Sequence, residues 1–84
     1  MSDLSAMPNI GGVLAQKMLE VDIYSAKALV EMGSKEAFLR VKTVYPDACI
    51  NHLYALEGAI KNIRWHHLSP ETKTELKIFF DSVK

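Results

Sequence analysis

The sequence has little of several features, and each shortage excludes a class of protein. One cysteine occurs among the 84 residues, so no internal disulfide can form and a reducing compartment is expected. No apolar run approaches the roughly 20 residues of a membrane-spanning helix, and the first residues lack the basic-then-apolar pattern of a secretion signal. The sequence therefore predicts a cytoplasmic protein with no membrane segment.

An excess of charge of one sign is also lacking. Lys and Arg total ten, Asp and Glu also total ten, and the formal net charge at pH 7 is zero. Avid nonspecific binding to nucleic acid depends on excess positive charge, so the balance argues against it but permits a small local contact. Strand signals are missing too, because no long stretch alternates apolar and polar residues and no Asn-Gly or Asp-Gly turn occurs.

What the sequence does have is helical periodicity. Its composition, 49% apolar and 24% charged, is that of an ordinary globular protein, and its length suits a single domain over residues 1–84. The longest pattern predicts a central helix from Ala48 to about Arg64, with Asp47 as its N-cap and Cys49 buried. Its apolar positions recur at steps of four and three: Cys49, Leu53, Leu56, Ile60 and Ile63.

The rest of the chain predicts shorter helices packed around that central one, in an all-α, compact bundle of about five helices. Ser25, Ser34 and Ser69 are expected as N-caps, and Val44 is expected on an inward face. In chain order the expected elements are a short turn at Asp3–Ala6, a tight turn over Met7–Gly12, and helices over Gly11–Glu20, Ala26–Met32, Lys35–Tyr45, Ala48–Arg64 and Glu71–Val83.

The turn over Pro8–Gly12 is the first candidate for function, because it resembles the helix-hairpin-helix element of DNA-binding proteins. In that element, backbone N–H groups at a helix N-terminus bind a phosphate oxygen, and glycine permits the close approach. Asn9 stands at the usual first glycine and Val13 at the usual lysine or arginine, while Lys17 offers a substitute charge. The turn is either purely structural or a phosphate contact formed by Asn9, Ile10, Gly11, Gly12 and Lys17.

Gly58 is the second candidate, since a glycine inside a helix costs about 1 kcal/mol relative to alanine. We expect another backbone to cross closely at Gly58, beside Tyr54, either from this chain or from a second copy. Ile78 is expected to point outward from the last helix. The candidate surface for a protein partner or a homodimer is therefore Tyr54, Gly58 and Ile78.

Catalytic and metal sites are not indicated. No Ser/His/Asp set, phosphate-binding loop or dinucleotide fingerprint occurs, and Glu57 with Lys61 one turn later suits an exposed ion pair. A structural zinc site usually needs four ligands at paired spacings, which is not the spacing of Cys49, His52, His66 and His67. We expect no catalytic residue, metal or cofactor, and no enzyme activity.

Three strings in the sequence closely resemble the C-terminal domain of TfoX/Sxy proteins. They are Met7-Pro8-Asn9-Ile10-Gly11, the segment Cys49-x-x-x-LYALEGAI, and IRWH-x-Leu68, and the resemblance runs from about Leu4 to Phe80. It implies a compact all-helical domain that contains a helix-hairpin-helix-like hairpin. Full-length members are bacterial regulators of competence genes, in some cases acting with the cyclic-AMP receptor protein, and they carry an additional N-terminal domain.

From this resemblance we expect a standalone, non-enzymatic regulatory or interaction domain of the TfoX C-terminal type. Its expected partner is either DNA, bound weakly and nonspecifically through the hairpin, or a protein such as a transcription regulator. The alternative is a protein–protein or self-association module with no nucleic-acid contact.

Overall fold

The computed structural model describes residues 4–83, which contain five α-helices and two short 3-10 turns and no strand. The predicted all-α bundle is therefore confirmed, while Asp3 lies outside the described residues. The elements are η1 (Leu4–Ala6), α1 (Gly12–Glu20), α2 (Ala26–Met32), α3 (Ser34–Val44), α4 (Ile50–Lys61), η2 (Trp65–His67) and α5 (Pro70–Ser82).

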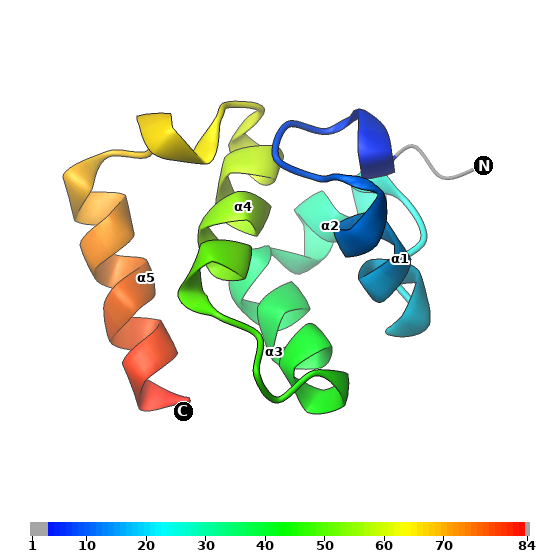
Figure 1. Ribbon diagram of the computed structural model, residues 1–84. Coiled ribbons are helices and arrows are strands. Elements are labelled where there is room, and N and C mark those ends of the chain that lie inside the picture. The colour runs from blue at the N-terminus through cyan, green and yellow to red at the C-terminus, as the bar shows by residue number, and fades with distance from the viewer. Residues whose placement is uncertain (1–3, 84) are drawn as a thin grey trace.

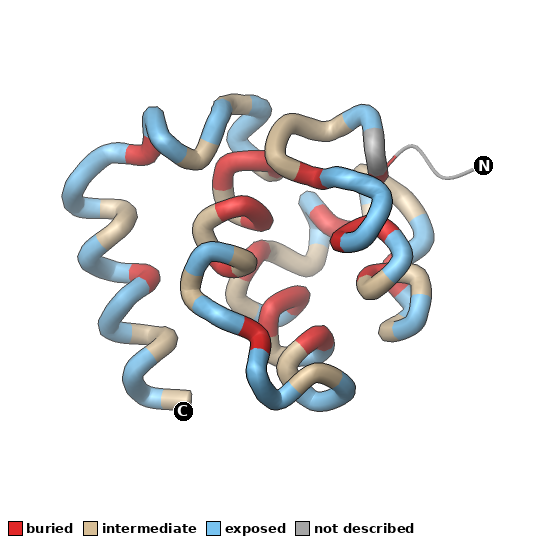
Figure 2. The backbone as a smooth tube through the Cα atoms, in the orientation of Figure 1, coloured by how far each residue is buried: buried red, intermediate tan, exposed pale blue. Residues whose placement is uncertain are grey.

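Helix α4 occupies the middle of the molecule, with α5 on one side of it and α1 and α2 on the other (Figure 1). It packs most extensively against α3 and α5. Buried residues concentrate on α3, α4 and the facing side of α1 (Figure 2), and α5 contributes only one buried residue, Leu76. The largest fully buried side chains are Phe38, Leu4, Met18, Ile23, Leu29, Leu53, Leu56 and Val41.

Several helix boundaries follow directly from local chemistry. The Ser25 hydroxyl accepts a hydrogen bond from the Ala28 N–H at 3.1 Å, and Ser69 accepts from Thr72 at 3.2 Å, so both are N-caps as predicted. Asp22 follows α1 in the left-handed conformation, with φ of 67°, and the chain then buries Ile23 completely. None of the helices within residues 4–83 is long and apolar enough to cross a membrane.

The predicted cap at Ser34 is wrong. Gly33, with φ of 88°, is the N-cap of α3, and Ser34 is the first residue of the helix itself. Ser34 is buried, and its hydroxyl donates to the Glu57 carboxylate on α4 at 2.5 Å instead of capping the helix. That carboxylate also forms the predicted ion pair with Lys61, at 3.2 Å.

The central helix is shorter at both ends than predicted. Its N-cap is Cys49 and not Asp47, and His52 Nδ1 accepts a hydrogen bond from the Cys49 backbone N–H at 3.2 Å. Cys49 is exposed, contrary to prediction, because it lies at the helix end and not on its packed face. The helix ends at Lys61, since Asn62 adopts the left-handed conformation with φ of 60°.

The outward and inward faces of the flanking helices are mostly as predicted. Ile78 on α5 is 66% exposed, which confirms its outward orientation. Val44 is 52% exposed, so its predicted inward placement is wrong. It is the last residue of α3, and solvent reaches it because the chain leaves the helix at Tyr45.

Candidate functional site

Asn9 joins the N-terminal turn to the corner that follows α4. Its backbone is left-handed, with φ of 69°, a conformation that asparagine adopts more readily than most residues. The side-chain Nδ2 donates to the Ile63 carbonyl at 2.9 Å, and Oδ1 accepts from the Trp65 backbone N–H at 3.0 Å. Both ends of the amide are therefore used to hold two distant segments together.

Gly58 lies against the Asn9 side chain, whose two hydrogen bonds form a clamp between the turn and the corner. A Cβ built on Gly58 would lie 2.5 Å from Asn9 Nδ2, 2.8 Å from the Ile63 carbonyl oxygen and 3.2 Å from the Trp65 Cα. The predicted close crossing is confirmed, and it is made by this chain. Gly58 is buried, and the half-buried Tyr54 stacks against Trp65 with ring centroids 6.0 Å apart, while the role of these two residues in binding a partner stays a prediction.

The two glycines of the turn are in a different situation. Gly11 and Gly12 are exposed, and a Cβ on either would meet no atom within 4 Å. Gly11 is the N-cap of α1 in extended conformation, and no side chain caps this helix start within the described residues. The first N–H groups of a helix have no intrahelical partner, so this start presents free donors. Ile10, in contrast, is buried in the core.

Lys17 does not join the turn. Its Nζ lies 4.6 Å from the centroid of the Tyr45 ring, and the Tyr45 hydroxyl donates to Glu20. The pKa of Tyr45 is raised, mainly by that hydrogen bond. Lys17 is thus engaged at the C-terminal half of α1, roughly 7 Å of helix rise beyond Gly12.

Basic side chains also occur in the corner after α4, to which Asn9 holds the turn. Arg64 lies between the two residues that Asn9 holds, and it is exposed, as are His66 and His67. Lys73 Nζ lies 5.7 Å from the centroid of the Trp65 ring. Sequence reasoning missed this group because more than 50 residues separate it from Asn9, and only the Arg-Trp-His-His string marked it.

Trp65 lies at the centre of this corner. Its ring stacks on His66 with centroids 4.2 Å apart and an interplanar angle of 26°, and on Tyr54 at an angle of 13°. It is half-buried and packs against the edge of the core. The result is a short aromatic stack that ends in the exposed His66.

Comparison with known proteins settles the family. A family model described as the TfoX C-terminal domain matches residues 1–80. The chain belongs to the TfoX C-terminal domain family. The match covers the turn, α4 and the corner that first suggested the resemblance.

Two crystal structures of Listeria monocytogenes proteins are very similar to this TfoX C-terminal domain. One is of an uncharacterized protein in a triclinic form, with 48% identity and a TM-score of 0.94, covering 95% of this chain and 91% of that one. The other is of a protein of unknown function in a tetragonal form, with 47% identity and a TM-score of 0.94, covering 96% and 100%. No protein of curated function matches the chain.

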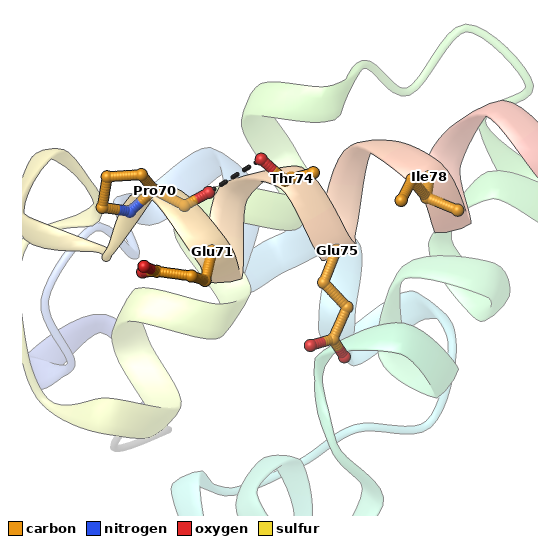
Figure 3. Close-up of a pocket in the computed structure, with 5 residues that line it drawn as sticks. All are labelled: Pro70, Glu71, Thr74, Glu75 and Ile78. Atoms are coloured by element: carbon orange, nitrogen blue, oxygen red, sulfur yellow. Dashed lines mark hydrogen bonds between the residues drawn. The ribbon is translucent and has the colours of Figure 1, made fainter.

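The second candidate surface of this TfoX C-terminal domain lies on the outer face of α5, around Ile78. An open depression there is lined by side chains of α5 alone, as Figure 3 shows: Pro70, Glu71, Thr74, Glu75 and Ile78. Two of its polar side chains already have partners, because the Thr74 hydroxyl donates to the Pro70 carbonyl and Glu75 binds Lys35 at 2.9 Å. The depression is one face of a helix and not a cleft between elements.

The residues weighed as metal ligands do not converge. Cys49 Sγ lies 3.7 Å from His52 Nδ1, but no third ligand is near, and no three His, Cys, Asp or Glu side chains within residues 4–83 gather as metal ligands do. Burial, and then the charge of Lys17, lower the pKa of His52. The predictions of no metal, no cofactor and no enzyme activity stay predictions.

Proposed function

We propose that this domain is a non-enzymatic regulatory or interaction domain that contacts the DNA backbone at the start of α1. The observation that carries the proposal is the exposed Gly11–Gly12 pair at an uncapped helix N-terminus, with open space around both α-carbons. The free N–H groups and the positive end of the helix dipole favour an anion there. The missing side chains let a phosphate oxygen approach the backbone.

The clamp at Asn9 supports this proposal. Its two hydrogen bonds fix the turn against Ile63 and Trp65, so little conformational freedom remains to be lost on binding. Backbone amides that hold a phosphate read no bases, which predicts binding with little sequence preference. With a net charge of zero, few counterions are released and the affinity is weak.

The experiment is an anisotropy titration of labelled duplex DNA at low and rising salt. We expect weak binding that falls as salt rises, with similar affinities for unrelated sequences. Gly12→Glu places a carboxylate in the first turn of α1, which favours the helix by roughly 0.3–1 kcal/mol but repels phosphate. It should keep the fold and abolish binding, whereas the neutral control Gly12→Gln, which adds a side chain of the same shape without the charge, should keep the fold and weaken binding less.

Two results would contradict the proposal. One is the absence of duplex binding by the unaltered domain at low salt. The other is equal binding by the Gly12→Glu and Gly12→Gln variants, because a contact at this helix start must distinguish a carboxylate from an amide of the same shape. Thermal melting of both variants shows whether the fold is intact in each case.

The second candidate is self-association, or binding of a protein such as a transcription regulator, through α5. The observation that favours it is Ile78, which is 66% exposed beside Pro70 on the outer face of the helix. Light scattering at increasing concentration tests self-association, with Ile78→Glu as the disrupting variant and Lys77→Gln as the control. A constant monomer mass for the unaltered protein would remove the homodimer.

A cytoplasmic setting belongs to the same proposal. In a bacterium the chromosome lies in the cytoplasm, so a domain that contacts DNA must be there too. The single cysteine, Cys49, is free and exposed, which suits a reducing environment in which thiols persist.

A further inference from the structure

The corner around Trp65 combines an aromatic stack with exposed cations. Tyr54 and His66 both stack on the Trp65 ring, and His66 is exposed. Lys73 reaches across this stack, with Nζ 5.7 Å from the Trp65 ring centroid and 3.5 Å from the His66 carbonyl oxygen. Arg64 precedes the stack and is exposed.

The two segments that meet at this corner carry no negative charge, although the whole chain is neutral. No carboxylate occurs from Asn62 to Pro70, and none from Leu4 to Gln16, the two segments that Asn9 joins. Lys61 pairs with Glu57, but neither Arg64 nor Lys73 forms an ion pair within the described part of the chain. Glu71, at the start of α5, is the first acid after Pro70 and stands two residues before Lys73.

We propose that Arg64, His66 and Lys73 form a binding surface for single-stranded nucleic acid. An unpaired base stacks on the outer face of the His66 ring and extends the existing stack, while the phosphates on either side face the two cations. Proteins that bind single strands without sequence preference combine these same two elements, a stacking surface and positive charge along the backbone.

The proposed function concerns duplex DNA, whereas this inference concerns single-stranded nucleic acid and rests on a different surface. A duplex keeps its bases stacked on one another and offers only phosphate, which suits the amides of Gly11 and Gly12. A single strand offers free base faces, which suit the exposed ring of His66. An acidic peptide would meet the cations but leave the stack unused.

Trp65 provides a direct measurement, because it is the only tryptophan in the chain. We expect its fluorescence to be quenched by an oligothymidylate of about ten nucleotides, with saturation and with weakening as salt rises. Anisotropy of a labelled oligothymidylate gives the affinity independently of changes in Trp65 emission. His66→Ala removes the stacking surface, Arg64→Gln removes a charge, and Lys77→Gln is the control on the far part of α5.

The first two variants should each weaken oligothymidylate binding by about fivefold or more, and the control by less than about twofold. All three positions are exposed, so the melting temperatures should be unchanged. The inference is overturned if oligothymidylate neither binds nor quenches Trp65 at low salt. It is also overturned if polyglutamate binds as tightly, or if the control weakens binding as much as Arg64→Gln.

The same titrations separate this inference from the proposed function. Oligothymidylate binding without any duplex binding contradicts the contact at α1 and leaves the corner supported. Duplex binding without oligothymidylate binding contradicts the corner alone. If Gly12→Glu loses the duplex and keeps the oligothymidylate, the two surfaces act separately, as proposed.

Discussion

The side chain of Asn9 lies against the α-carbon of Gly58, where the N-terminal turn crosses the central helix. A Cβ on Gly58 would come within 2.5 Å of Asn9 Nδ2, which also donates to the Ile63 carbonyl. The glycine in the middle of α4 and the asparagine in place of the turn's first glycine therefore have one explanation. Gly58 leaves room for the Asn9 side chain, and Asn9 forms the two hydrogen bonds that hold the turn at the corner.

Replacing Gly58 with alanine should destabilise the domain. Alanine gains about 1 kcal/mol of helix propensity, but its methyl group meets the clamp and a backbone carbonyl, and overpacking of this kind typically costs 1–3 kcal/mol or more. We expect a net loss of about 1–2 kcal/mol by chemical denaturation. Gly12→Ala is the matched control, because that site is open and the change should be neutral or slightly stabilising. Equal stability of the two variants would contradict the crossing.

Substitution of Asn9 should separate its hydrogen bonds from its backbone conformation. Asn9→Gly removes both bonds but accepts positive φ, so it should cost about 1–3 kcal/mol for the unpaired partners at Ile63 and Trp65. Asn9→Ala adds the strain of a left-handed alanine, about 1 kcal/mol more. Denaturation of both variants gives the two differences. If Asn9→Gly is as stable as the unaltered domain, the clamp contributes nothing.

Stability should decrease in mild acid because of His52. Burial, with Lys17 as a second cause, lowers its folded-state pKa below 6.5, and the neutral ring accepts from the Cys49 N–H. The contribution is therefore complete above pH 6.5, and it is lost as the pH falls through the lower folded-state pKa, since the unfolded chain binds the proton more readily. His52→Gln should reduce the slope of melting temperature against pH, and an unchanged slope would contradict this assignment.

The hydroxyl of Ser34 should contribute to the packing of α3 on α4. Ser34→Ala removes a buried hydrogen bond to Glu57 and leaves that carboxylate with Lys61, which predicts a loss of about 1 kcal/mol. The exposed Ser82 on α5 gives the control, because Ser82→Ala removes only a bond to a carbonyl in its own helix. Denaturation curves that do not distinguish the two variants would show that the contact between helices is not stabilising.

The fold was largely predictable because helix periodicity and capping act over a few residues. Ser25, Ser69 and Asp22 all behave as local chemistry dictates. The start of α4 was misplaced because Asp47 and Cys49 are both available within one turn. The choice depends on the bond that His52 makes back to Cys49, which the apolar pattern does not contain.

The candidate site was predictable only in part, for a similar reason. The Gly11–Gly12 turn can be recognised from the local sequence, since paired glycines mark a turn. The role of Asn9 and the approach of Arg64 depend on hydrogen bonds that span 54 and 56 residues, and no local pattern encodes such a pairing. The glycine at position 58 predicted a close crossing, but the local sequence does not show which segment crosses there.

The most direct test of the central claim is to follow the backbone amides of Gly11, Gly12 and Val13 by nuclear magnetic resonance while a short DNA duplex is added. If phosphate binds at the start of α1, these amides shift in a saturable, salt-sensitive way, and the shifts are absent in Gly12→Glu. Amides that remain unshifted while the duplex binds elsewhere, or a duplex that does not bind at low salt, would contradict the account.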